Sequence, residues 1–166
     1  MQLLSVRQPW AWAIARGRMP IENRDWAPSY RGQLAIYASM RVDLHAGENP
    51  LVSFSGWDPS DPAAAMGGIV AVAMLADVCS AAITGQPCGC GEWARPAMYH
   101  WRLTGVHALD RPVVRIGRAG PMRDAIPLRG LGRPFASGEE PQADQRGLWE
   151  PEPTVVAEVA AAAGLA

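Results

Sequence analysis

The sequence predicts a small α+β domain built around a mixed β-barrel, and three observations support this. Short apolar segments with strand-like patterns recur between turns rich in glycine and proline. One short helical pattern lies near the amino terminus. The 166 residues suffice for one domain with a single good core. Several short strands joined by turns, with few helices, are typical of a small barrel.

Each predicted element has a local signal. Pro9 suits the first turn of a helix, where its missing N–H costs nothing, and Gly17 suits the helix end. Residues 43–67 are rich in Pro, Gly, Asp and Ser, which indicates a long loop with room for one helical turn. An alanine-rich helix is expected over residues 154–163. Six alternating or continuous apolar runs predict strands at residues 3–6, 19–24, 33–38, 68–78, 98–103 and 112–116.

The predicted domain covers residues 1–150, followed by a tail or short helix at 151–166. Residues 131–145 are polar and acidic and are expected to form an insertion. No segment approaches the roughly 18 unbroken apolar residues of a membrane helix, and the first residues lack the apolar region of a signal peptide. We therefore expect a cytoplasmic protein with no membrane partner.

The net charge of −1 conceals an uneven distribution of arginine. Residues 1–41 carry six arginines against two acids, and residues 95–133 carry eight against two. Segments 42–94 and 134–166 are acidic. If the two basic segments meet in the fold, they form a positive face; otherwise arginine is merely scattered over solvated surface. The chain has no lysine, which excludes a lysine base or Schiff base.

The three cysteines, Cys79, Cys88 and Cys90, do not indicate a disulfide framework, because they are odd in number and close together. The spacing of Cys88 and Cys90 is tighter than that of the usual zinc knuckle, and only His100 follows nearby. We therefore expect reduced thiols in a turn, with no metal and no other cofactor.

Three motifs stand in order near the amino terminus: LSVRQPWA at residues 4–11, IENRDW at 21–26, and YRG at 30–32 before a strand that ends in AS at 38–39. The chain resembles the ASCH domain, a branch of the PUA-like superfamily, in these motifs and their spacing. Weaker matches are the apolar run at 68–78, YHWRL at 99–103 and RGLW at 146–149. In the family this last motif usually follows directly on a P-[IV]-P-x-[RK]-G segment. Here IPLRG at 126–130 is separated from it by the acidic insertion.

The resemblance implies a small PUA-like β-barrel with a few short peripheral helices and a cleft beside the early helix. Such domains are associated with RNA or DNA, and a few are ribonucleases or remove the acetyl group from acetylated cytidine. The deacetylating members carry a catalytic lysine and a threonine at the positions that are Met19 and Glu22 here. The resemblance therefore argues against a lysine-dependent amidohydrolase.

Nucleic-acid binding is the predicted function, with RNA or another single strand, or a modified nucleoside within it, as the partner. Tryptophan can stack on a base and arginine can bind phosphate, while Glu22 and Asn23 could read the edge of an extruded base. Arg146 and Trp149 would close the far wall of the cleft if the family geometry holds. The candidate contact residues are Arg7, Gln8, Trp10, Arg18, Glu22, Asn23, Arg24, Trp26, Tyr30, Arg31, Ser39, Arg146 and Trp149.

Purely structural roles are the alternative for some of these residues. Glu22 and Arg24 share one strand face and could simply form a surface ion pair, which would be worth at most about 1 kcal/mol. Trp10 and Trp12 cannot share a helix face, and Trp10 is the better core candidate because it aligns with Ile14.

Two other functions stay open. One is a hydrolase of nucleic acid or of a modified nucleoside in the same cleft, with a metal-independent ribonuclease favoured among the enzymes. Its candidate proton-transfer residues include His45, His100 and His107, none of which has a diagnostic spacing. The other is a protein-interaction module in which the acidic segments matter more than the basic ones.

Overall fold

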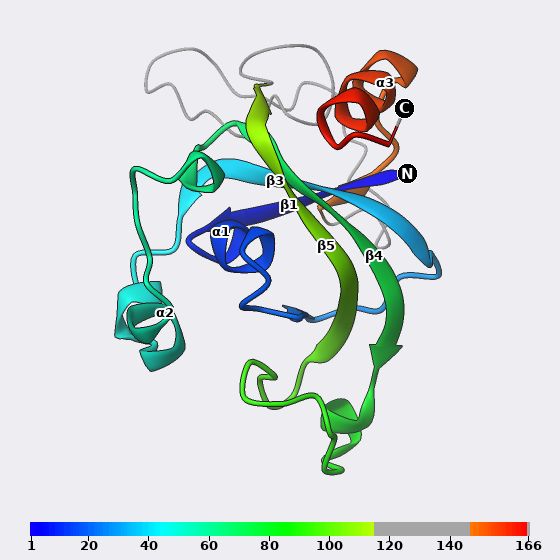
Figure 1. Cartoon of the computed structure of the whole chain (residues 1–166). Helices are drawn as coiled ribbons and strands as arrows, with labels where there is room; N and C mark the ends of the chain where they lie inside the picture. The colour runs from blue at the N-terminus through cyan, green and yellow to red at the C-terminus, as the bar shows by residue number, and fades with distance from the viewer. Residues whose placement is uncertain (115–146, 166) are drawn as a thin grey trace, which may run out of the picture.

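A curled six-stranded sheet is the main feature of the computed structural model, which describes residues 1–114 and 147–165 (Figure 1). β1 runs parallel to β3, and the other neighbouring pairs are antiparallel. This mixed, curled sheet with short helices confirms the predicted α+β class and PUA-like barrel. The strand order is β2 (Ile21–Arg24), β5 (Tyr99–Val114), β4 (Gly68–Cys79), β3 (Gly32–Val42), β1 (Gln2–Gln8) and β6 (Leu148–Trp149).

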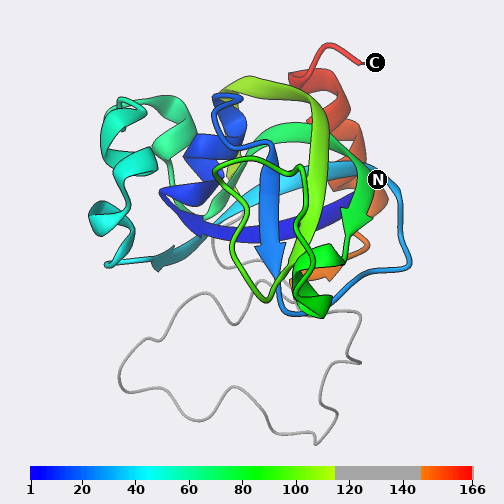
Figure 2. The same cartoon turned by 90° about the horizontal axis from the view of Figure 1, so that it is seen from below.

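Short helices cover the sheet. α1 (Trp10–Ala15) lies inside its curl, as Figures 1 and 2 show from two directions. α3 (Pro153–Ala162) lies near the amino-terminal end of β1. α2 (Pro50–Phe54) and the 3-10 helices η1 (Ala46–Glu48) and η2 (Pro62–Ala64) occupy the segment expected to be a long loop. Within residues 1–114 and 147–165, no helix is long and apolar enough to cross a membrane.

Both faces of the middle of the sheet are buried. On the inner face, Leu4 and Ile36 belong to the core cluster that contains α1. On the outer face, Leu3 and Tyr37 pack in a second cluster with Val159 of α3. Because neighbouring residues of a strand point to opposite faces, a sheet covered on both sides needs apolar residues at consecutive positions. This explains the continuous apolar runs in the sequence.

Asp61 holds the segment before β4 against α1. Its Oδ2 accepts hydrogen bonds from Trp12 Nε1 at 3.0 Å and Arg16 Nε at 2.7 Å. Its Oδ1 accepts from the Ala63 backbone N–H at 2.9 Å, which caps η2. The hydrogen bonds from the Arg16 guanidinium are the main reason that the pKa of Asp61 falls to about 2.

The expectation that Trp10 is the core tryptophan was wrong. Trp12 is only 3% exposed and belongs to the inner core, whereas Trp10 is half-buried. The reason is that α1 is enclosed on nearly every side, with residues 11–15 all buried. Alignment with Ile14 therefore did not identify a single buried face.

The two strands expected at 98–103 and 112–116 are one long strand, β5, from Tyr99 to Val114. Its pairing with β4 contains register shifts, and Gly105 has a φ of +55° close to one of them. Such irregularities let a strand continue through a segment that does not alternate. Residues 115 and 116 and the predicted insertion at 131–145 lie outside the described residues.

Candidate nucleic-acid interface

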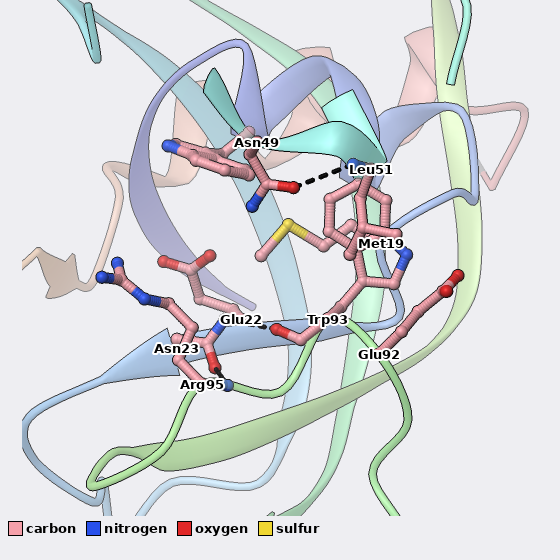
Figure 3. A pocket seen from close by; sticks show the side chains of 9 residues that line it. Met19, Glu22, Asn23, Asn49, Leu51, Glu92, Trp93 and Arg95 are labelled. Carbon is pink, nitrogen blue, oxygen red and sulfur yellow. Dashed lines mark hydrogen bonds between the residues drawn. The ribbon is translucent and has the colours of Figure 1, made fainter. Parts of the chain in front are cut away.

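A pocket of about 120 Å³ lies between the start of α1, β2 and the connection from β4 to β5 (Figure 3). An apolar cavity of about 150 Å³ can hold a benzene ring. The pocket is therefore suited to a single ring rather than a whole nucleoside. Its lining residues are Trp10, Met19, Glu22, Asn23, Asn49, Leu51, Glu92, Trp93 and Arg95.

Glu22 brings a buried carboxyl group to this pocket. The residue is 7% exposed, and its Oε1 accepts a hydrogen bond from Arg24 Nε at 2.8 Å. Burial raises the pKa of Glu22 above its ordinary value, although the charge and hydrogen bond of Arg24 oppose the shift. Among the described residues Oε2 has no such partner, so this oxygen is available to a ligand.

Arg24 positions Glu22 and closes the barrel. Its Nη2 donates to the Ser5 carbonyl oxygen at 2.6 Å, which ties β2 to β1, four places away in the strand order. Its guanidinium lies 5.9 Å from the ring centroid of Trp101. The side chains of Arg24 and Glu22 are 19% and 9% exposed, so theirs is an inward-facing pair and not a surface one. Arg24 is therefore engaged within the protein, whereas the sequence had suggested a link to phosphate.

Two tryptophans and a methionine make the apolar part of the pocket. The rings of Trp10 and Trp93 lie edge to face, with centroids 6.4 Å apart. Trp10 Nε1 donates to Asp43 Oδ2 at 3.0 Å, which fixes the Trp10 ring. Met19 is buried, and its thioether points into the pocket (Figure 3). An aromatic wall of this kind offers a stacking surface for a flat ring.

Asn23 holds the Trp93–Arg95 segment, which forms one wall of the pocket, in place. Its Nδ2 donates to the Trp93 carbonyl oxygen at 2.9 Å, and its Oδ1 accepts from the Arg95 backbone N–H at 2.8 Å (Figure 3). Both ends of the amide are thus used by the backbone. Asn23 is better described as a positioning residue than as a reader of a base.

The exposed arginines differ in how much of their charge is available. Arg95 lines the pocket, and neither Arg95 nor Arg18 has an ion-pair partner among the described residues. Arg31 Nη1 donates to carbonyl oxygens of its own turn at 2.9 and 2.8 Å. Arg7 is exposed, and its charge helps to lower the pKa of Asp43, though less than the Trp10 hydrogen bond does.

Besides Arg7, Arg18, Arg24 and Arg31, five predicted contact residues lie outside the pocket: Gln8, Trp26, Tyr30, Ser39 and Trp149. The Gln8 amide is buried and bonded to the backbone of α1 and of the η2 segment. Trp26 packs edge to face on a buried indole of β5, and the Tyr30 hydroxyl donates to the backbone. Ser39 bonds to the backbone of Arg41 within β3, and Trp149 packs against the outer core. Arg146 lies outside the described residues.

Six pocket-lining residues were not among the predicted contacts: Met19, Asn49, Leu51, Glu92, Trp93 and Arg95. Asn49 Oδ1 accepts from the Leu51 backbone N–H at 2.9 Å and caps α2 (Figure 3). An asparagine followed by proline is a helix-start signal that could have revealed α2. Trp93 is an isolated tryptophan in a turn-rich segment, and this was the sequence signal that could have indicated that the segment lines the pocket.

A second cluster lies outside the pocket. The ligand atoms of Cys79, Cys88, Cys90 and His100 all lie within 4.8 Å of one another. The sequence-based expectation of no metal rested on the tight spacing of Cys88 and Cys90 and on the lack of an evident fourth ligand, whereas the structure brings four possible ligands together. The antiparallel register of β4 and β5 places Cys79 directly opposite His100, which spacing along the chain did not reveal.

The curled mixed sheet around α1, with a ring-sized pocket against β2, defines a PUA-like barrel. A family model of the ASCH domain matches residues 4–111, well over half of the chain. The chain therefore belongs to the ASCH domain family, a PUA-like and RNA-binding type of domain. No curated protein matches the chain.

Proposed function

We propose that this protein binds single-stranded RNA and takes one base, ordinary or modified, into the pocket beside Glu22. The observation that carries the proposal is a buried carboxyl group with one available oxygen in a ring-sized pocket beside Trp10 and Trp93. A buried polar atom without a partner costs free energy, and an N–H group of a base would recover it. The indole rings would add stacking.

The carboxyl group of Glu22 sets the expected selectivity. When ionised it only accepts hydrogen bonds, so it favours a base edge that presents amino or imino N–H groups. Because burial raises its pKa, lowering the pH would convert the carboxyl to a donor before an ordinary glutamate changes. The preferred base should therefore change, or affinity should fall, on mild acidification.

Arg95 is the best-placed phosphate contact. It is exposed, lines the pocket, and its guanidinium has no ion-pair partner within residues 1–114 and 147–165. Each phosphate contact to a single strand contributes about 0.7 to the slope of log K against log salt concentration. Arg95→Gln should lower that slope by about 0.7. Arg111→Gln, an exposed arginine of β5 that does not line the pocket, is the matched control and should leave the slope unchanged.

Binding is measured by fluorescence polarisation of labelled single-stranded oligonucleotides at several salt concentrations. Trp93→Leu removes a stacking partner worth about 1–3 kcal/mol, so affinity should fall about 5-fold to 150-fold. Trp149→Leu, a half-buried tryptophan outside the pocket, is the control. Oligonucleotide binding that is absent, or insensitive to both salt and Trp93→Leu, would refute the proposal and favour a protein-interaction module.

A hydrolase in the same pocket has one observation in its favour. Glu22 is buried with a raised pKa, which suits a general acid or base. A histidine-based ribonuclease has less support, because none of the three histidines lines the pocket: His45 and His107 are exposed, and His100 lies in the cysteine cluster. Incubation with end-labelled RNA without metal distinguishes the two functions, since the proposal requires binding without cleavage.

A further inference from the structure

We propose that Cys79, Cys88, Cys90 and His100 bind one zinc ion, which fixes the connection between β4 and β5. Three cysteines and one histidine are a usual ligand set of structural zinc. The four ligand atoms all lie within 4.8 Å of one another. In tetrahedral zinc, with sulfur at about 2.3 Å and nitrogen at about 2.0–2.1 Å, ligand atoms stand about 3.5–3.8 Å apart. Small inward movements are enough to complete the site.

Two of the four proposed zinc ligands lie on strands of the sheet. Cys79 ends β4 and His100 is the second residue of β5, and the two residues are directly opposite in the ladder. Cys88 and Cys90 come from the connection between the strands. A spacing of one residue is unusual for a zinc knuckle that must hold its ion between two loops. Here Cys88 and Cys90 only have to add two ligands to Cys79 and His100, which the two strands already hold side by side.

His100 already has the tautomer that a metal ligand needs. It is 1% exposed, and its Nε2 lies 2.7 Å from the Arg95 carbonyl oxygen. A carbonyl oxygen only accepts, so Nε2 carries a proton, and the lone pair of the neutral form of the ring is then on Nδ1. That atom lies 3.3 Å from Cys88 Sγ, inside the cluster. A hydrogen bond from the second ring nitrogen to a carbonyl group is the usual arrangement of zinc-bound histidine.

The connection has little else to hold it. None of residues 80–98 is buried, and its regular structure is the single 3-10 turn η3 (Ala81–Thr84). A connection of this length without its own core is uncommon in a compact domain. Small structures that cannot bury a core commonly use a metal or disulfides instead. Cys79, Cys88 and Cys90 are free thiols in this structure.

The proposed zinc is coupled to the pocket wall. His100 is bonded to the Arg95 carbonyl oxygen, and Asn23 is bonded to the Arg95 N–H and the Trp93 carbonyl oxygen. None of the four ligands lines the pocket. Zinc would therefore act as a structural ion that positions Trp93 and Arg95, and it has no direct contact with a base.

The first test is metal content. The full chain is purified under reducing conditions, supplied with Zn²⁺, dialysed and analysed for metals. We expect one zinc per chain, falling to less than about a tenth in Cys88→Ser. His107→Gln, which changes an exposed histidine outside the cluster, should keep its zinc. Bound zinc that is unchanged in Cys88→Ser, or no zinc in the loaded wild type, would overturn the proposal.

The second test keeps the wild-type chain and replaces zinc with Co²⁺. Tetrahedral thiolate coordination gives intense visible d–d bands and a near-ultraviolet sulfur-to-cobalt charge-transfer band. The charge-transfer band should nearly vanish in Cys88→Ser, because that variant is expected to lose the metal. An octahedral spectrum without a thiolate band, iron bound in place of zinc, or a disulfide between two of the thiols in freshly purified protein would contradict the assignment.

A chelator adds a readout of structure. Removing zinc from the wild type should lower Tm by about 10 °C and speed amide exchange in residues 80–98, because the ion binds the folded state alone. Unchanged Tm and exchange after complete removal would refute the structural role. These measurements contain no RNA, so their failure would leave the proposed function of the pocket untouched.

Discussion

Replacing Asp61 by asparagine should destabilise the protein at neutral pH but not at very low pH. Asp61 accepts from Trp12 Nε1, Arg16 and the Ala63 N–H, so it joins η2 to α1, whose first residue lines the pocket. Asparagine keeps the size of the side chain and one acceptor oxygen. What it loses is the negative charge opposite the Arg16 guanidinium and the second acceptor oxygen, which protonation of the wild-type carboxyl group also removes.

The expected magnitude follows from the pKa of Asp61, which the Arg16 hydrogen bonds lower from an ordinary 3.8 to about 2. One pKa unit corresponds to about 1.36 kcal/mol, which sets a ceiling of about 2.4 kcal/mol. The Arg16 side chain is 39% exposed, so solvent screening reduces the effect to about 1–2 kcal/mol. Because the folded-state pKa is the lower one, this stabilisation is complete above the ordinary value of 3.8 and disappears as the pH falls through about 2.

The assay is urea unfolding followed by tryptophan fluorescence at pH 7 and at several values between pH 4 and pH 2. The free energy of unfolding of Asp61→Asn should lie about 1–2 kcal/mol below the wild type at pH 7, and the difference should vanish near pH 2. Asp110→Asn removes an exposed carboxylate of β5 and should change little. A difference that is the same at pH 7 and pH 2, or less than about 0.5 kcal/mol at pH 7, would refute the reasoning.

Two further predictions concern the pocket. Asn23→Ala removes two hydrogen bonds to the Trp93–Arg95 segment, each worth about 0.5–1.5 kcal/mol, so the free energy of unfolding should fall by about 1–3 kcal/mol and RNA affinity should fall with it. Urea denaturation measures the first effect and fluorescence polarisation the second, and Gln33→Ala, at an exposed position, is the control. An unchanged RNA affinity would show that binding does not depend on the hydrogen bonds from Asn23 to the Trp93–Arg95 segment. Acetylated cytidine should not be converted to cytidine, because Met19 stands where deacetylating relatives have lysine and a thioether cannot accept a proton usefully. Chromatography measures cytidine, and turnover abolished by Glu22→Gln would show that this prediction is wrong.

The parts of the fold that the sequence predicted are those with strong local signals. The run at 68–78 is apolar except for Asp77, and the structure has β4 over Gly68–Cys79, with residues 68–73 buried on both faces. The helix expected over 154–163 is α3. β5 was predicted as two strands because its middle does not alternate. The register shifts that keep it continuous depend on pairing with β4, which no local pattern encodes.

The site was predictable only where its residues are close in sequence. Trp10, Glu22 and Asn23 line the pocket and lie within the amino-terminal motifs. Trp93 and Arg95 reach it from a loop about 70 residues later in the chain, so the hydrogen bonds from Asn23 could not be foreseen. Several motif residues proved instead to hold the barrel together, since a polar group within a motif can bond to the backbone as well as to a ligand.

The same limit applies to the cysteine cluster. Chain spacing showed a pair separated by one residue and a distant histidine. Only the antiparallel pairing of Cys79 with His100 brings the four groups together. Tertiary register, and not local sequence, decides whether these side chains can share an ion.

The position of β1 within the sheet constrains how the protein can be made. β1 precedes β3 and β6 in the chain, yet it lies between them in the sheet, and β6 is at Leu148–Trp149. At about 5–20 residues per second, a ribosome needs about 5–20 s to travel from the end of β3 to β6. Throughout that interval one edge of an apolar strand has unpaired N–H and C=O groups that can pair with another chain. Stalled or prematurely terminated synthesis before Leu148 would therefore release a chain prone to self-association, whereas a chain that includes β6 pairs Leu3 and Leu4 of that edge with Trp149 and Leu148.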